Sequence, residues 1–313
     1  MDISQRINTT PQTEEEVEPF LEVTPELVQK RRSQGRIIFD RFRKNKVAII
    51  GAVFLIILFL FCFVGPFVLG RGDPNAINPV SANTPPSAAY PFGTDNLGRD
   101  LVARSMAGGQ VSLLVGLSSM LIALIIGVGI GAFAGYYGGL FDNILMRITD
   151  VFLSVPLYLL LFVLSAALTD HTPRSVIILI AAFGWMYVAR LVRGEFLSLR
   201  EREYVLAART IGAKDLRMMF RHILPNAAGP IIVSATLLIG SNIILESVMS
   251  YFQFGIRPPA SSWGNLIGDG QDFFYTDPWL VFVPGLLIFF TVLSINLVGD
   301  GLRDALDPYM TER

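Results

Sequence analysis

The chain has 313 residues, of which 52% are hydrophobic and only 16% are charged, and its formal net charge is −1. Soluble globular chains carry about 25% charged residues, so this composition argues against a soluble globular protein. The apolar residues form long runs separated by polar segments, a pattern typical of a protein that crosses a membrane several times.

The first 46 residues change the sign of their charge along the chain. Residues 1–30 are rich in acids and poor in apolar residues, and we interpret them as a largely disordered tail. Residues 30–46 are instead basic, and a basic cluster directly before an apolar run is typical of the cytoplasmic side of a membrane. The cluster consists of Lys30, Arg31, Arg32, Arg36, Arg41, Arg43, Lys44 and Lys46.

Six apolar segments are long enough to cross a membrane as helices. A span needs about 20 residues, because a helix rises about 1.5 Å per residue and the hydrocarbon core is about 30 Å thick. The sequence therefore predicts an all-α membrane protein with six transmembrane helices. In the third span, Arg147 and Asp150 lie one helical turn apart and could pair with each other. The predicted spans are 47–69, 111–137, 144–168, 175–192, 226–248 and 279–298.

The charge of the segments between the spans predicts the side of the membrane on which each lies. Basic residues are enriched in cytoplasmic loops. The segment 193–225 is strongly basic, whereas the segment 249–278 has one basic residue and three aspartates. We therefore expect both termini to be cytoplasmic. The predicted division of the chain is a cytoplasmic tail at 1–46, a first helix at 47–69, an extracytoplasmic loop at 70–109, a core of five helices at 110–305 and a cytoplasmic tail at 306–313.

No pattern in the sequence predicts chemistry on this chain. It lacks the Gly-x4-Gly-Lys-Ser/Thr loop that holds nucleotide phosphates. Its two histidines lie far apart in the sequence, and neither they nor the single cysteine suggests a catalytic or metal site. Gly127, Gly131 and Gly135 are spaced by four inside an apolar span, which favours close packing of two membrane helices over ligand binding. We expect a chain that is not an enzyme and that binds no cofactor or metal itself.

The loop between Glu203 and Asn226 has the features of a docking element. Small side chains at Ala207 and Ala208 would let another surface approach the backbone, and Gly212 would permit a left-handed turn between two short helices. In the second short helix, apolar side chains recur at helical spacing, and Pro225 is expected to end it and to open the fifth span. These apolar residues are Leu216, Met219 and Phe220. Such a loop could dock into a groove of a soluble partner or lie on the lipid surface, and the pattern alone does not separate the two.

Two polar residues near the outer end of the fifth span are candidates for a translocation pathway. Asn242 and Glu246 lie one turn apart, and burying an ionisable residue in a membrane is costly. Glu246 could alternatively reach the outer interface or pair with a partner subunit. It also leaves open a transporter driven by an ion gradient, which needs ionisable groups near the membrane midplane.

Several motifs of this sequence resemble those of a known family. The loop reads Tyr204-Val-Leu-Ala-Ala-Arg209-Thr-Ile-Gly212 and then His222-Ile-Leu-Pro-Asn226. This spacing is similar to the EAA loop of ATP-binding-cassette (ABC) importer permeases, where the loop forms a coupling helix in a cleft of the ATPase subunit. Leu206 stands where that motif has its glutamate, a departure familiar in the peptide-type branch.

Further segments resemble the C-type permeases of dipeptide, oligopeptide and nickel importers. They lie in the same order along the chain, and the resemblance covers residues 44–308. The segments are Phe92-Gly-Thr-Asp-Asn-Leu-Gly-Arg-Asp100, Gly135-Tyr-Tyr-Gly-Gly139, Pro258-Pro-Ala-Ser-Ser-Trp-Gly-Asn265 and Asn296-Leu-Val-Gly-Asp-Gly-Leu-Arg-Asp304.

The resemblance implies a function and a set of partners. The implied fold is that of a type I ABC importer permease in a bacterial or archaeal plasma membrane, and the implied cargo is a dipeptide or oligopeptide, with nickel or glutathione as alternatives. The implied partners are a second, B-type permease subunit, two ATP-binding subunits that hold ATP and Mg, and an extracytoplasmic substrate-binding protein. Membrane lipid is the remaining expected partner, and no nucleic acid is expected.

Overall fold

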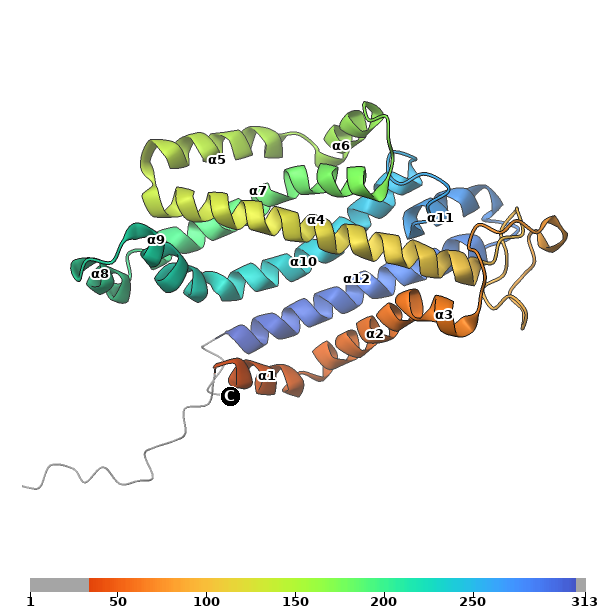
Figure 1. Ribbon diagram of the computed structural model, residues 1–313, viewed down its shortest axis with the longest axis horizontal. Helices are drawn as coiled ribbons and strands as arrows, with labels where there is room; N and C mark the ends of the chain where they lie inside the picture. Colours follow the sequence, from red (N-terminus) through yellow and green to blue (C-terminus); the bar gives the residue numbers. More distant parts are fainter. Residues whose placement is uncertain (1–33, 308–313) are drawn as a thin grey trace, which may run out of the picture.

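The structure, a computed structural model, describes residues 34–307, and the regular secondary structure in that range is helical, apart from one isolated bridge between Thr94 and Asp100. The predicted acidic tail and the first three residues of the basic cluster lie outside the described residues. The longest helices run side by side along the long axis of the molecule (Figure 1). They are α2 (Lys46–Phe63), α4 (Leu101–Tyr137), α7 (Pro173–Leu199), α10 (Leu224–Tyr251) and α12 (Trp279–Leu306).

Shorter helices lie at both ends of this bundle and, in the case of α5, along its side (Figure 1). One end, here named the loop end, carries the segment between α7 and α10, and the opposite end carries α11 (Figure 1). Helix α1 packs against α12. The shorter helices are α1 (Gln34–Lys44), α3 (Gly65–Leu69), η2 (Pro79–Ser81), α5 (Gly139–Ser154), α6 (Leu157–Ala166), α8 (Glu203–Thr210), α9 (Asp215–Arg217), the π-helix η3 (Met218–Ile223), α11 (Trp263–Gly270) and η4 (Gln271–Phe273).

Five of the described helices are long and apolar enough to cross a membrane, and α5 with α6 makes a sixth if this bent pair counts as one span. The predicted third span at 144–168 is not one continuous helix, because α5 and α6 meet at 84°. Val155 is extended, with ψ of 134°, and Pro156 follows it. Proline disfavours the helical conformation of the residue before it and lacks the N–H that a continuous helix needs.

The spans also begin and end at other residues than predicted. Helix α4 starts at Leu101, ten residues before the predicted start, because Asp100 caps it by accepting a hydrogen bond from the Val102 amide at 2.9 Å.

Pro225 does not separate two helices, since one helical rod runs from Asp215 to Tyr251. The rod accommodates this proline through the π-helical turn that directly precedes it.

Helices α4 and α7 form the closest pair in the bundle. A Cβ atom added at Gly127, Gly131 or Gly135 would lie between 2.5 and 2.8 Å from atoms of α7, so only glycine fits at these three positions. The prediction that this spacing mediates helix packing is therefore confirmed. Helix α2 packs on α12 in a similar way, since a Cβ at Gly51 would lie 2.9 Å from the Ser294 carbonyl oxygen.

The charged residues of α5 do not pair within their own helix. Asp150 forms an ion pair with Arg190 of α7 rather than with Arg147. One turn further along α7, Arg193 donates two hydrogen bonds to Asp142, at 2.9 and 2.6 Å. Because both carboxylates find arginines on another helix, the predicted Arg147–Asp150 pair is replaced by ion pairs that tie α5 to α7.

Candidate functional site

The segment between α7 and α10 folds back onto the loop end of the bundle. Its buried apolar residues belong to one core cluster with residues of α4 and α7, such as Ala132 and Phe196. Burial of these side chains stabilises the loop, because each fully buried side chain of this size contributes about 1.5–3 kcal/mol. The buried residues contributed by the loop are Val205, Ala208, Met218, Met219 and Ile223.

The predicted docking residues fall on two opposite sides of this loop. Ala207, Leu216, Phe220 and Pro225 are exposed, whereas Ala208 and Met219 are buried. The prediction that Met219 shares an outward face with Leu216 and Phe220 is therefore wrong, and Ala208 is not available for close approach by another surface. The π-helical turn changes the angular spacing of these residues, which a regular 3.6-residue period does not anticipate.

Three apolar residues that we did not predict complete the exposed surface. Ile211 is 86% exposed at the turn after α8, and Tyr204 and Leu206 are exposed along α8. Together with two predicted residues they form what we name the loop face. It consists of Tyr204, Leu206, Ile211, Leu216 and Phe220. Apolar side chains in a basic loop were visible in the sequence, but only burial separates the loop face from the buried side.

Gly212 makes the turn between the two short helices. Its φ is +84°, and the amide of the next residue, Ala213, donates to the Ala208 carbonyl at 3.1 Å. No atom lies within 4 Å of a Cβ added at Gly212, so the backbone conformation, not space, requires glycine here. The predicted left-handed turn is confirmed, and it holds Ile211 outward at the tip of the loop.

Replacing Gly212 with leucine is expected to distort this turn while leaving the rest of the fold intact. A β-branched or bulky residue in the left-handed region costs about 1–2 kcal/mol, whereas asparagine tolerates it better. We predict that Gly212→Leu accumulates in membranes like the wild type but loses most of the transport activity that the resemblance implies, with Gly212→Asn retaining most of it. Equal transport by the two variants would show that the turn geometry is unimportant.

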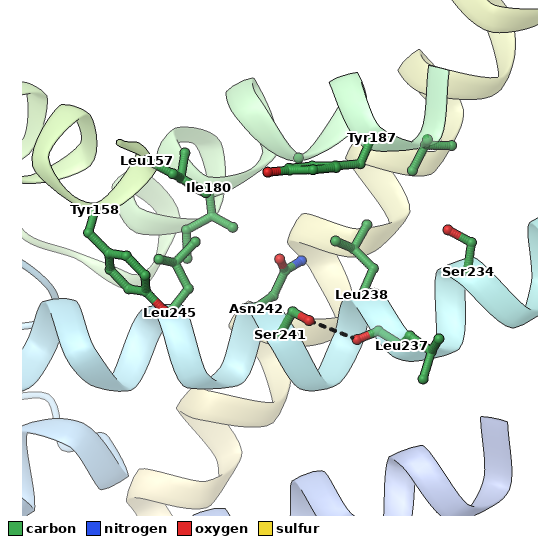
Figure 2. Close-up of a pocket in the computed structure, with 12 residues that line it drawn as sticks. Leu157, Tyr158, Ile180, Tyr187, Ser234, Leu237, Leu238, Ser241, Asn242 and Leu245 are labelled. Carbon is green, nitrogen blue, oxygen red and sulfur yellow. Dashed lines mark hydrogen bonds between the residues drawn. The ribbon is translucent and has the colours of Figure 1, made fainter. Parts of the chain in front are cut away.

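A cavity of about 360 Å³ lies halfway along the bundle, between α6, α7 and α10 (Figure 2). Its lining is mainly apolar, with polar groups from Tyr187, Ser234, Ser241 and Asn242. Asn242 donates a hydrogen bond to Ser119 of α4 at 2.9 Å. The structure thus brings the predicted Asn242 to a cavity inside the candidate membrane spans.

A second cavity continues the first toward the loop end of the bundle. Its volume is about 660 Å³, and it shares Tyr187, Ser234 and Leu237 with the first cavity. Arg303 and Asp307, at the end of α12, border it at the far side. The two cavities together form an open groove along α7 and α10, which we name the central groove.

Glu246 does not border the central groove. It is fully buried and accepts hydrogen bonds from Ser112 at 2.8 Å and Ser250 at 2.7 Å. Ser250 in turn accepts from the Ile256 amide at 3.0 Å. Glu246 thus joins α4 and α10 to the chain that leads to α11, so the structure places it in a packing role away from the central groove.

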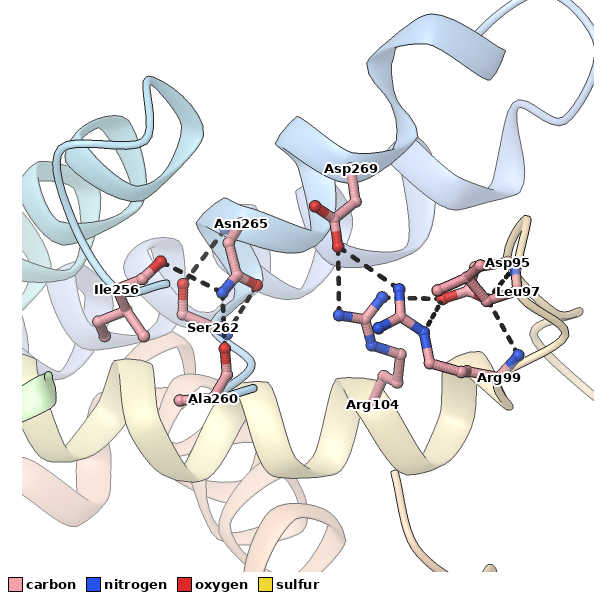
Figure 3. A network of polar contacts seen from close by, with 9 residues as sticks. All are labelled: Asp95, Leu97, Arg99, Arg104, Ile256, Ala260, Ser262, Asn265 and Asp269. Atoms are coloured by element: carbon pink, nitrogen blue, oxygen red, sulfur yellow. Dashed lines mark hydrogen bonds and ion pairs between the residues drawn. The ribbon is translucent and has the colours of Figure 1, made fainter. Parts of the chain in front are cut away.

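An ion network joins three segments at the α11 end of the bundle (Figure 3). Arg104 of α4 is 2% exposed and donates to Asp95 at 2.9 Å and to Asp269 of α11 at 3.2 Å. Arg99 also pairs with Asp95, at 2.7 Å. Nearby, the Ser262–Asn265 capping box holds the start of α11. The network ties the loop before α4 to α11.

Comparison with known proteins identifies the family to which this arrangement belongs. Residues 127–312 match the family of binding-protein-dependent transport system inner membrane components, and residues 33–86 match the N-terminal transmembrane domain of oligopeptide transport permease C. The chain is a member of this inner-membrane transport family. It is a multi-pass membrane permease, and its helices are the spans of that permease.

Similar proteins cover nearly the whole permease. The oligopeptide transport system permease protein OppC of Bacillus subtilis is 40% identical over 268 residues, which are 86% of this chain and 87% of that protein. The dipeptide transport system permease protein DppC of the same organism is 40% identical over 86% of this chain and 83% of its own length. A putative peptide transport system permease protein of Brucella abortus is 41% identical over 86% of this chain and 90% of its own length.

Proposed function

We propose that this permease forms half of the pathway through which an ABC importer carries dipeptides or oligopeptides across the plasma membrane. The other half would be a B-type permease subunit, driven by two ATP-binding subunits that hold ATP and Mg and supplied by an extracytoplasmic binding protein. The names of the similar proteins support peptides as cargo. Nickel and glutathione are the alternatives within the same architecture.

The loop face is the observation that carries this proposal. Five apolar side chains are exposed on a polar, basic loop whose other side is packed firmly onto α4 and α7. An exposed apolar surface on a rigid support is more stable in a groove of a soluble protein than in contact with water. We propose that the loop face docks into the ATP-binding subunit. The loop end and both termini would then be cytoplasmic. The basic side chains in the segment 193–225 also favour this orientation.

The central groove would form one wall of the pathway. Its lining is mainly apolar with a few hydroxyl and amide groups, a surface without strong preference for one side chain, which suits peptides of varied sequence. Selectivity would then rest largely on the binding protein. An ion-coupled transporter is less well supported, because Glu246, the acid that kept this alternative open, is enclosed by serine hydroxyls away from the groove.

Transport by the purified complex tests this proposal. The permease is reconstituted in liposomes with its B-type partner, the ATP-binding subunits and the binding protein, and uptake of a radiolabelled peptide is followed. We expect uptake that requires ATP and the binding protein and that stops when the ATP-binding subunits are omitted. Uptake driven by an ion gradient without those subunits would overturn the proposal.

Cysteine crosslinking locates the docking surface directly. The native Cys62 is buried, so it contributes little background labelling. We predict that Ile211→Cys and Ala207→Cys crosslink to a cysteine-bearing ATP-binding subunit with a short bifunctional reagent. Ala208→Cys is the matched control, since it is one residue away but packed inside the core. Labelling of Ile211→Cys only from outside the cell would refute the proposed orientation.

A further inference from the structure

Tyr136, in the last turn of α4, contacts both short helices of the loop. Its side chain is 5% exposed and belongs to the core cluster that the loop shares with α4 and α7. The Tyr136 hydroxyl donates a hydrogen bond to the Asp215 carboxylate of α9 at 2.7 Å. The same hydroxyl accepts a hydrogen bond from Arg209 of α8 at 3.4 Å, and the Arg209 guanidinium lies 5.8 Å from the centre of the Tyr136 ring.

These contacts place one hydroxyl between the two sides of the Gly212 turn. Arg209 precedes the turn and Asp215 follows it, so a movement of either short helix changes the distance to Tyr136. Another hydrogen-bonded contact at the end of α4 is different in kind. Arg200, directly after α7, donates to the Gly135 and Tyr136 carbonyl oxygens at 3.1 and 3.2 Å, and thus holds α7 to α4 rather than the turn to α4.

The α4 side of this contact is rigid. Gly131 and Gly135 hold α4 directly against α7, with no room for a side chain between them. A force applied to Tyr136 therefore acts on both helices as one unit, and α7 lines the central groove through residues such as Tyr187 and Val188. The path from the loop face to the groove is short: the Gly212 turn, the Tyr136 hydroxyl, and the α4–α7 pair.

We propose that Tyr136 is a positioning residue that transmits movement of the loop face to the α4–α7 pair through its hydroxyl. The inference rests on the proposed function, because the movement is supplied by the ATP-binding subunits. Apolar packing of the loop holds it on the bundle, whereas the directional hydrogen bonds to Asp215 and Arg209 make loop and helix move together. Without the hydroxyl, the loop would slide over its apolar contacts, and its movement would no longer move α4.

The test is the number of peptides transported per ATP hydrolysed by the reconstituted complex. Tyr136→Phe removes the hydroxyl and keeps the buried ring, so assembly and membrane level are expected to equal those of the wild type. We expect transport per ATP to fall about fivefold or more, the size of a typical coupling between two sites. Tyr137→Phe is the matched control, since Tyr137 is adjacent and half exposed, and no hydrogen bond of its hydroxyl is found among the described residues.

A double-mutant cycle separates transmission from simple packing. Asp215→Ala alone should also lower transport per ATP, and adding it to Tyr136→Phe should cause little further loss, because both changes break the same hydrogen bond. Wild-type transport per ATP in Tyr136→Phe, or an equal loss in Tyr137→Phe, would overturn the inference while leaving the proposed function intact. A wild-type complex that imports peptide without ATP would overturn both.

Discussion

Replacing Gly131 with leucine is expected to separate α4 from α7 and to remove most of the folded permease from the membrane. A Cβ atom at this position would lie 2.5 Å from the Ala189 carbonyl oxygen and 2.8 Å from the Val192 Cβ. The nearest atom belongs to the backbone of α7, which cannot move aside as a flexible side chain would. Overpacking of this kind costs about 1–3 kcal/mol and more when a backbone must shift.

The measurement is the thermal unfolding midpoint of the purified permease complex in detergent, together with its level in membranes. Gly129→Leu is the matched control, because Gly129 lies on the same helix two residues away and nothing lies within 4 Å of a Cβ added there. We expect Gly129→Leu to behave like the wild type. If the two variants lost stability equally, the loss would come from helix propensity or insertion and not from the α4–α7 contact.

Replacing Arg104 with methionine is the second change with a large expected effect. Arg104 is 2% exposed and bridges Asp95 and Asp269, with Asp95 itself buried. Methionine keeps much of the side-chain volume but leaves the Asp95 carboxylate with Arg99 as its remaining arginine partner. Removing one member of a buried ion pair costs about 3–5 kcal/mol, so we expect the α11 end of the bundle to loosen first.

Limited proteolysis of the loop before α4, with the unfolding midpoint, measures this effect. Arg257→Met is the matched control: it removes the same charge from the chain between α10 and α11, but at an exposed side chain. Arg104→Lys should fall between the wild type and Arg104→Met, because lysine retains the charge but cannot bridge two carboxylates as a planar guanidinium does. Unchanged protease resistance in Arg104→Met would show that the network does not hold the loop.

Two kinds of information in the sequence were sufficient for much of the fold. Apolar runs of about 20 residues predicted the positions of the membrane helices, because hydrocarbon requires a continuous apolar surface and internal backbone hydrogen bonds. Glycines spaced by four predicted a close helix–helix contact on α4, although not its partner, because that interval places them on one face of a helix. The Gly212 turn was predicted for an equally local reason, since only glycine adopts its φ without strain.

Other features depend on where distant residues meet. The pairing of Arg104 with Asp269 joins residues 165 positions apart, and no local pattern indicates which of several aspartates faces the arginine. Glu246 has the sequence signature of a pathway residue, but it is fully buried and accepts hydrogen bonds from Ser112 of α4 and Ser250 of α10. In both cases the tertiary structure decides, because burial changes the energetics of a charged group more than its own sequence neighbours do.

The sequence by itself determined the class of this protein, the approximate positions of its spans and the loop that carries the proposed docking surface, since these follow from local apolar content, charge and glycine placement. Only the tertiary structure decided which side of that loop is exposed. Met219 and Phe220 are adjacent and both apolar, yet one lies in the core and the other on the loop face. The packing of α8 and the π-helical turn against α4 and α7 determines this difference, and with it the residues that a partner can reach.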